Sequence, residues 1–287
     1  RALDSDFGSY SGAFLGSASD ESQYANPGNQ IEDFYNGAWS PSNAKNSMWT
    51  TSYRAIANCN LYLEEFLGLA FPELILNSDY PQQMFRYNNY QYEVRFLRAY
   101  FYFNLVRQYG DVPLVESGMS TDEINSLSRK PAQEIFEYII LECDEIKDKI
   151  IADYTNLGDM SLPSGQSETA RANRLAVLAL KARTSLYAAS PLFNVNDDKD
   201  LWRKAALANK ELIDACKESG MKLAKDYSSL WAQDNWSAPE PYKEIIFTRR
   251  IGDSNSLESY NFPVGVEGGK GGNCPTQTLV DAYEMKA

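Results

Sequence analysis

The chain of 287 residues contains no histidine and only four cysteines. The absence of histidine excludes Ser-His-Asp and Cys-His catalytic groups and removes the commonest zinc ligand. The cysteines are far apart and form no CxxC pair, and three of them fall on apolar helical faces, where we expect small core residues: Cys59, Cys143 and Cys216, with Cys274 outside that group. We therefore predict no metal site and no cofactor.

Long apolar runs and an excess of positive charge are also missing. No stretch is long enough to span a bilayer. The formal net charge is -12, which argues against nucleic-acid binding and against electrostatic docking onto anionic lipid. This net negative charge is compatible with an uncharged ligand or a cationic partner.

The most informative stretch is the aromatic run from Glu93 to Val115. Its large apolar residues cover most of the circumference of a helix, so we predict a buried helix rather than a surface one: Phe96, Leu97, Tyr100, Phe101, Phe103, Leu105 and Val106. Gly110 and Pro113 supply the end signals, and Val112, Leu114 and Val115 predict a short extended segment.

Apolar spacing predicts five long helices, beginning near Ser42 or Asn43 and alternating with polar connections: 43–67, 85–109, 131–150, 171–189 and 199–219. Antiparallel pairs of this length are the format of tetratricopeptide (TPR) repeats. We therefore predict a mainly α, TPR-like fold with long irregular loops and a few short strands, among them 243–250. We expect Asn60 to be a buried, hydrogen-bonded packing residue, and Trp49 and Trp202 to lie in the core.

Six segments, taken in order, resemble the SusD/RagB family of nutrient-binding lipoproteins of the Bacteroidetes outer membrane: Trp49-Tyr53-Ile56-Asn60, the run Glu93 to Leu114 with Phe96-Leu97-Arg98-Ala99, Arg129 with Ile135 and Ile139, Leu178 to Ala189, Lys243 to Phe247, and Thr276 to Met285. Together they extend over nearly the whole chain. The last of these segments normally lies near the middle of a family member. The chain therefore departs from the family pattern in its length.

The resemblance implies one SusD-like domain over 1–287, forming the N-terminal portion of a longer secreted protein. Its TPR-like region is expected at about 42–220 and its loop-rich ligand side at 1–41 and 221–287. It further implies a non-catalytic, cell-surface protein that binds oligosaccharide or polysaccharide and passes it to a SusC-like, TonB-dependent transporter. Attachment to the outer membrane would use a lipid-anchor cysteine upstream of Arg1.

Aromatic residues outside the helical stripes are the candidate ligand platforms, because sugar rings stack on aromatic faces and hydrogen-bond through their edges. They lie in three loops, and we predict glycan stacking or polar contacts from Trp39, Asn36, Trp231, Trp236, Asn235 and Tyr260. Each of these aromatics could instead anchor its loop on the domain.

Three other functions compete with glycan capture. Peptide capture of the RagB type would need a deep groove with charged walls. A TPR-like interaction scaffold without a small ligand would have its loops collapsed onto the helices. A glycosidase would need two facing carboxylates, and no recognisable pair occurs among the 39 acidic residues, so we expect no catalysis.

Overall fold

The computed structural model describes residues 12–45, 47–163, 168, 170–224, 244–248 and 255–283. The chain divides into two compact units. We call Arg1–Ser47 with Arg250–Ala287 the terminal unit, and Met48–Arg249 the helical unit.

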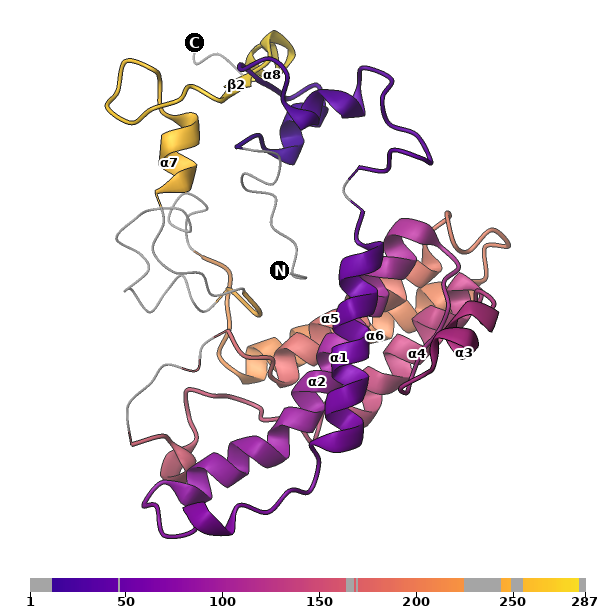
Figure 1. Ribbon diagram of the computed structural model, residues 1–287, viewed down its shortest axis with the longest axis vertical. Coiled ribbons are helices and arrows are strands. Elements are labelled where there is room, and N and C mark those ends of the chain that lie inside the picture. Colours follow the sequence, from indigo (N-terminus) through magenta and orange to yellow (C-terminus); the bar gives the residue numbers. More distant parts are fainter. Residues whose placement is uncertain are drawn as a thin grey trace. The chain divides into compact units, whose positions relative to one another are not determined.

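The helical unit is a series of packed helices (Figure 1). These are α1 (Trp49–Glu65), α2 (Tyr80–Tyr109), α3 (Thr121–Ser126), α4 (Ala132–Ile146), α5 (Arg174–Ala189) and α6 (Lys199–Glu218), with single 3-10 turns η3 (Pro72–Leu74) and η4 (Gly158–Met160). Helix α1 packs on α2, α2 on α4, α4 on α5 and α5 on α6. This arrangement confirms the predicted mainly α, TPR-like fold.

Helix α2 lies at the centre of this unit and carries much of its core. Phe96, Tyr102, Phe103 and Leu105 are almost fully buried, as the aromatic run predicts. Gly110 follows the helix at φ +68°, a backbone conformation that glycine adopts readily. The predicted extended segment after the helix is confirmed at Val112, which forms an antiparallel bridge with Lys130.

The predicted burial of Asn60 in α1 is confirmed, since only 1% of its surface is exposed. Its amide Nδ2 donates to the carbonyl of Val115 at 3.0 Å, and its Oδ1 accepts from Arg98 Nη1 at 3.0 Å. A buried amide is tolerated because its donors and acceptors are satisfied. Asn60 thereby ties α1 to α2 and to the segment after α2.

Two predicted helix starts were misplaced. Helix α1 begins at Trp49 because Ser40 and Asn43 form a turn: Asn43 N donates to Ser40 O at 2.9 Å and its Nδ2 to Ala38 O at 2.8 Å. Helix α2 begins at Tyr80, with Pro81 in its first turn, where proline costs no hydrogen bond.

Two further predictions in the helical unit were wrong. In α6 the buried face consists of Ala205, Ala208 and Ala215, whose small side chains allow close approach to α5, and this leaves Trp202 39% exposed.

Residues 244–248, the described part of the predicted strand 243–250, contain a turn and a bend instead. There Ile246 packs on Leu175, Leu178 and Ala215, so side-chain packing fixes the segment without a strand partner.

The terminal unit joins segments from both ends of the sequence. It contains η1 (Leu15–Ala18), β1 (Ser22–Tyr24), η2 (Gln30–Phe34), α7 (Ser256–Asn261), β2 (Asn273–Pro275) and α8 (Gln277–Ala282). Strands β1 and β2 pair antiparallel, with Ser22 opposite Pro275. Asn273 connects the segments further: its Oδ1 accepts from Phe14 N at 2.9 Å and its Nδ2 donates to Asn261 Oδ1 at 3.0 Å.

Candidate functional site

An exposed aromatic surface follows η2 in the terminal unit, and we call residues 34–43 the aromatic turn. Trp39 is 56% exposed, and its ring meets that of Phe34 edge-on, with centroids 5.1 Å apart and an interplanar angle of 68°. Phe34 in turn packs on the small core that contains Ile31. Phe34 thus links one side of the indole to this core, while more than half of the indole surface remains available for a ligand ring.

Local polar groups hold the aromatic turn in shape. Asn36 Oδ1 accepts from Ala38 N at 2.9 Å. Gly37, which lies between Asn36 and Ala38, has φ +86°, a backbone conformation that favours glycine. Asn36 therefore shapes the turn that presents Trp39, and its predicted contact with a glycan stays a prediction.

Tyr260, the predicted platform in α7, is half-buried rather than open. Its ring lies beside Gly12, and Lys270 Nζ sits 4.1 Å from the ring centroid. This is a cation–π contact that holds the loop against the ring. Among the described residues no contact joins Tyr260 to Trp39. The predicted residues Trp231, Asn235 and Trp236 lie outside the described residues.

The close fit between Gly12 and Tyr260 leads to a stability prediction. Gly12 has φ +100°, and a β-carbon there would overlap the Tyr260 ring. Gly28 has a comparable φ of +78° with no atom within 4 Å of such a carbon. We expect Gly12→Ala to lower the free energy of unfolding by about 2–4 kcal/mol and Gly28→Ala by about 1 kcal/mol. Urea unfolding of both variants measures the difference, and equal losses would contradict this packing.

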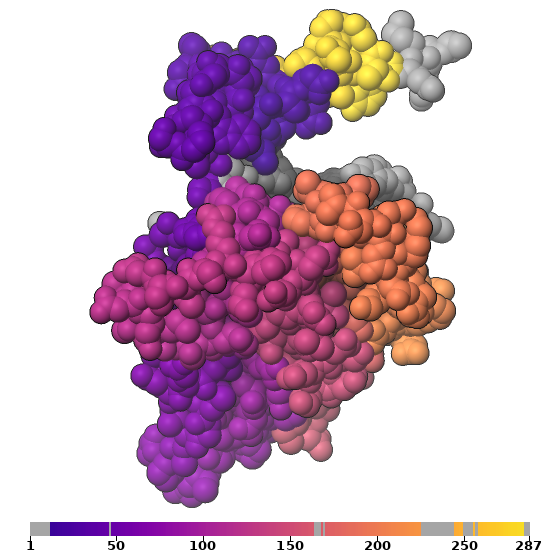
Figure 2. Space-filling view, turned by 90° about the vertical axis from the view of Figure 1, so that its right-hand side faces the viewer, coloured from indigo at the N-terminus to yellow at the C-terminus, as the bar shows by residue number. Residues whose placement is uncertain are grey.

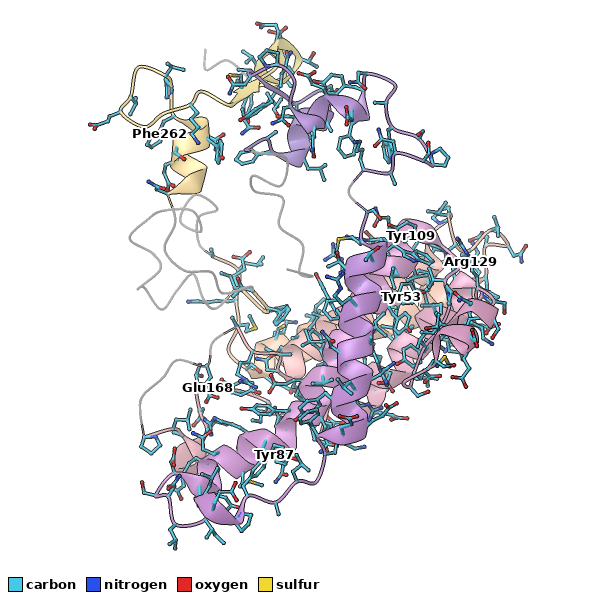
Figure 3. The ribbon with its side chains drawn as sticks, in the orientation of Figure 1. Tyr53, Tyr87, Tyr109, Arg129, Glu168 and Phe262 are labelled. Atoms are coloured by element: carbon cyan, nitrogen blue, oxygen red, sulfur yellow. The ribbon has the colours of Figure 1, made fainter. Side chains whose placement is uncertain are left out.

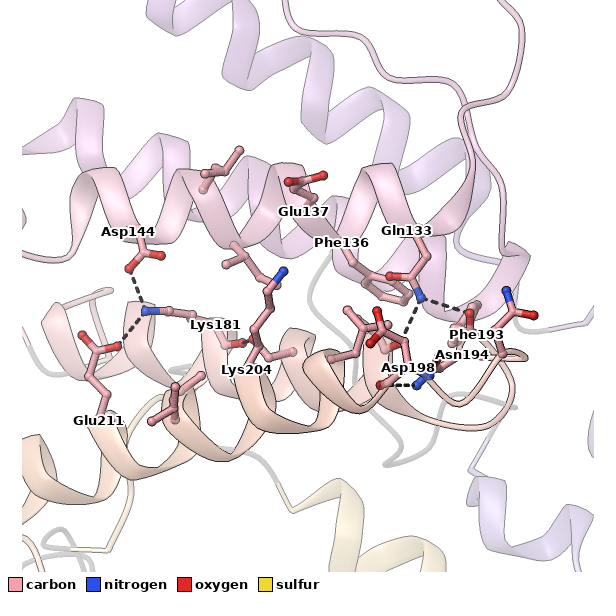
Figure 4. Close-up of a pocket in the computed structure, with 18 of the residues that line it drawn as sticks. Gln133, Phe136, Glu137, Asp144, Lys181, Phe193, Asn194, Asp198, Lys204 and Glu211 are labelled. Atoms are coloured by element: carbon pink, nitrogen blue, oxygen red, sulfur yellow. Dashed lines mark hydrogen bonds and ion pairs between the residues drawn. The ribbon is translucent and has the colours of Figure 1, made fainter.

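A second candidate site is a groove of about 700 Å³ between α4, α5 and α6, which we call the α4–α6 groove (Figure 4). Apolar side chains from α4 and α6 line its sides, including Ile140, Leu141 and Leu207. Leu141 and Leu207 are both more than half exposed. The sequence analysis missed this groove because it forms between three helices that are separated along the chain.

Charged side chains form an ion-pair network across one end of the α4–α6 groove. Lys181 of α5 contacts Asp144 of α4 and Glu211 of α6, each at 2.7 Å (Figure 4). Lys147 bridges the same two carboxylates at 2.8 and 2.6 Å. Burial of Glu211 opposes its ionised form, but the hydrogen bonds from Lys147 and Lys181 outweigh this effect and lower the pKa of Glu211. The same two effects lower the pKa of Asp144.

These lowered pKa values predict an acid-dependent loss of stability. A carboxylate whose pKa is lower in the folded than in the unfolded state stabilises the fold above its ordinary pKa. That stabilisation is lost as the pH falls below about 4.5 towards the folded-state pKa. We therefore expect Glu211→Gln to flatten the fall in unfolding free energy between about pH 5 and pH 3. Glu218→Gln on the same helix serves as control, and an unchanged slope in Glu211→Gln would contradict the assignment.

A third feature is an aromatic groove of about 520 Å³ beside α1, lined by Trp49, Tyr53 and the segment that follows α2. Trp49 is half-buried, with Tyr109 edge-on at 5.1 Å and the Arg129 guanidinium 5.4 Å from its ring. Tyr53 donates to Pro113 O at 2.7 Å. Figure 3 shows Tyr53, Tyr109 and Arg129 at one end of the helical unit. Trp49 was predicted to lie in the core, but it is only half-buried and lines this groove, because its neighbours Tyr109 and Arg129 contact it without enclosing it.

The sequence of residues 14–186 matches a family model described as SusD-like, starch-binding and associating with the outer membrane. The chain belongs to this SusD-like family. A curated relative, SusD-like protein P2 of Formosa agariphila, is 27% identical over 167 residues, which cover 58% of this chain and 28% of that protein.

Solved SusD-like structures share the fold. A SusD-like protein from Bacteroides fragilis superposes with a TM-score of 0.68 at 23% identity, covering 94% of this chain and 48% of its own. A SusD superfamily protein from Parabacteroides distasonis gives 0.66 at 26% identity, covering 94% and 53%. A laminarin-binding SusD-like protein and surface glycan-binding protein A of Bacteroides fluxus, each 21% identical, have the same fold.

This SusD-like chain spans about half the length of the solved structures that it matches and 28% of the curated relative. Its family associates with the outer membrane. Within the described residues, no helix combines the length and the apolar character that crossing a membrane requires.

Proposed function

We propose that this protein binds oligosaccharide or polysaccharide at the cell surface and delivers it to a SusC-like, TonB-dependent transporter. The observation that carries the proposal is the indole of Trp39, which contacts Phe34 on one side while more than half of its surface stays open. A rigid, exposed aromatic ring beside hydroxyl and amide groups suits the apolar face and polar edge of a sugar. Ser40, Ser42 and Asn43 supply such groups in the same turn.

The chemistry of the ligand follows from charge. The net charge of -12 repels polyanions and leaves a neutral glycan unaffected. The family description, starch-binding, and the laminarin-binding fold neighbour support a neutral glucan as the first ligand to test. The transporter is expected to contact the surface of the helical unit.

We infer that the protein captures its ligand without cleaving it. Asp144 and Glu211 approach the same two lysines, and both have lowered pKa values. A glycosidase needs one carboxyl group whose pKa is raised so that it can donate a proton. The pKa values of Asp144 and Glu211 are therefore shifted in the direction opposite to the one that a proton donor needs.

Peptide capture is the second candidate, and the α4–α6 groove is the observation that favours it. The groove combines apolar walls with charged residues from three helices, including Lys181, Glu137 and Lys204. An extended or helical peptide could place apolar side chains between α4 and α6 and pair its charges with these groups. Leu207→Asp would then abolish peptide binding and leave glycan binding intact.

The test is calorimetric titration with maltooligosaccharides, laminarin and a peptide digest. We expect saturable glucan binding that Trp39→Ala weakens about thirtyfold, the size typical of a tryptophan at the centre of a binding site. Trp202→Ala, which removes a partly exposed tryptophan on α6, is the matched control and should bind as the wild type does. Trp231→Ala and Trp236→Ala test the remaining predicted platforms. Binding of peptides alone would replace glycan capture with the second candidate.

The transporter partnership needs its own measurement. The SusC-like protein produced together with this chain should co-purify with it in detergent and bind it in a titration between the purified proteins. If the two proteins do not associate, the proposed delivery to the transporter is wrong, whereas the proposed glycan binding is unaffected.

A further inference from the structure

The aromatic turn contains the one Asn-Gly pair of the chain, Asn36-Gly37. The turn belongs to the indigo segment of the terminal unit, whose surface is seen in Figure 2. Asparagine is a chemically labile residue, and the backbone nitrogen of a following glycine can attack its side-chain amide, because no β-carbon crowds that nitrogen. The attack closes a five-membered succinimide ring without an enzyme or a cofactor. A reactive amide therefore lies in the turn that presents Trp39.

A hydrogen bond within the turn brings the two reacting groups together. Ala38 N donates to Asn36 Oδ1 at 2.9 Å, and the ring that this bond closes contains both Asn36 Cγ and Gly37 N. The side-chain amide is thus folded back towards the nitrogen that attacks it, and such positioning favours an intramolecular step. The same N–H faces the oxygen on which negative charge develops during the attack, where a donor stabilises the transition state.

The surroundings of Gly37 leave room for the ring to close. No atom lies within 4 Å of a β-carbon built on Gly37. Asn36 and Gly37 are both exposed, so water can reach the ring once it has formed. Ala38 is anchored from its other side, because its carbonyl oxygen accepts from Asn43 Nδ2 at 2.8 Å. The donor that faces the Asn36 amide therefore belongs to a residue that is itself held in place.

We propose that Asn36 is a site of spontaneous deamidation through a succinimide with Gly37. A bond forms between Gly37 N and Asn36 Cγ while the bond from Cγ to Nδ2 breaks, and Nδ2 leaves as ammonia with the proton from Gly37 N. Water then opens the ring. Hydrolysis at Cγ leaves aspartate, whereas hydrolysis at the backbone carbonyl carbon of residue 36 leaves isoaspartate, in which Cβ and Cγ have become part of the main chain.

Either product changes the aromatic turn, and the effect on ligand binding rests on the proposed glycan site at Trp39. Aspartate adds a negative charge close in sequence to Asp33, whose carboxylate pairs with Lys45 Nζ at 2.6 Å. Isoaspartate lengthens the main chain by one carbon atom and removes the side-chain acceptor that Ala38 N uses. We therefore expect the affinity for glycan to fall as the isoaspartate form accumulates.

Peptide mapping by mass spectrometry follows the modification in the full-length protein during incubation at mildly alkaline pH. Deamidation adds about 1 Da to the fragment that contains Asn36, and chromatography separates isoaspartate from aspartate. The internal control is Asn77, which is also exposed but precedes Ser78, a residue whose β-carbon crowds the attacking nitrogen. We expect Asn36 to react at least about tenfold faster than Asn77. Equal rates at both asparagines would overturn the proposal.

The same chain unfolded in urea shows what the fold contributes. Because the turn holds the amide towards Gly37 N, we expect Asn36 to react at least as fast in the folded as in the unfolded protein. A folded-state rate well below the unfolded-state rate would mean that the turn protects Asn36, and this result would also overturn the proposal.

Calorimetric titration before and after the incubation tests the consequence for ligand binding. The control is Asn36→Gln, whose longer side chain cannot close a five-membered ring, so its affinity should be the same before and after. If the fresh wild type binds no glycan, the proposed function is wrong, whereas the change in mass still decides whether Asn36 is deamidated. If the fully modified protein binds as tightly as the fresh one, the expected effect on the Trp39 site is wrong.

Discussion

Replacing Arg98 with alanine is expected to lower the free energy of unfolding by about 3 kcal/mol. The Arg98 guanidinium is nearly buried and donates to Asn60 Oδ1 at 3.0 Å, to Glu116 O at 3.1 Å and to Glu142 Oε2 at 3.3 Å. Its removal leaves buried acceptors unpaired. Glu142 retains its bond to Arg95 at 2.7 Å, which keeps the loss below that of a fully orphaned buried charge.

Urea unfolding monitored by far-ultraviolet circular dichroism measures this loss, since the signal comes mainly from the helical unit. Arg203→Ala is the control, because Arg203 and Asp200 form an ion pair in which both side chains are about two-thirds exposed. Such a pair contributes less than about 0.5 kcal/mol. Similar small losses in both variants would contradict the view that the Arg98 contacts join α1, α2 and α4.

Truncating Phe103 to alanine is expected to cost about 3–5 kcal/mol. Phe103 is 2% exposed and meets Tyr187 of α5 edge-on at 5.1 Å. The guanidinium groups of Arg107 and Arg183 each lie 5.8 Å from its ring. The substitution therefore leaves a cavity between α2 and α5 and removes two cation–π contacts.

Phe103→Leu separates these contributions, because leucine refills much of the cavity but lacks the ring. We expect it to cost about 1–2 kcal/mol in thermal and urea unfolding. Equal losses for alanine and leucine would mean that the ring contacts, rather than the cavity, dominate at this position.

The helical core was predictable because its signals are local. The aromatic run of α2 covers most of the circumference of a helix, and Gly110 marks the end of that helix. Asn60 was identifiable as a packing residue because an amide within an apolar stripe must find partners. Pro81 could have placed the start of α2 correctly, since proline favours the first helical turn.

Features that depend on contacts between distant segments were not predictable. The buried face of α6 is set by how closely its alanines approach α5, and a stripe that includes Trp202 was equally consistent with the apolar spacing. In the segment 244–248, Phe247 packs against Phe96 of α2 at 5.4 Å, a contact that no local pattern encodes. The α4–α6 groove likewise forms from three separated helices.

The candidate glycan site was only partly accessible to sequence reasoning. Turn residues around Trp39 indicated a loop aromatic, and the structure places that ring at the surface. Tyr260 has the same sequence signature, yet it packs beside Gly12 and Lys270. Whether a loop aromatic is open or packed depends on which remote segment reaches it.

Hydroxyl-radical footprinting of Trp39, with and without the glucan that binds most tightly in the calorimetric panel, tests the central claim most directly. Trp202, also partly exposed but on α6, is the internal reference. If glycan stacks on the aromatic turn, saturating ligand will slow the oxidation of Trp39 severalfold and leave Trp202 unchanged. An unchanged oxidation rate at Trp39 under saturating, calorimetrically verified binding would show that the glycan is held elsewhere.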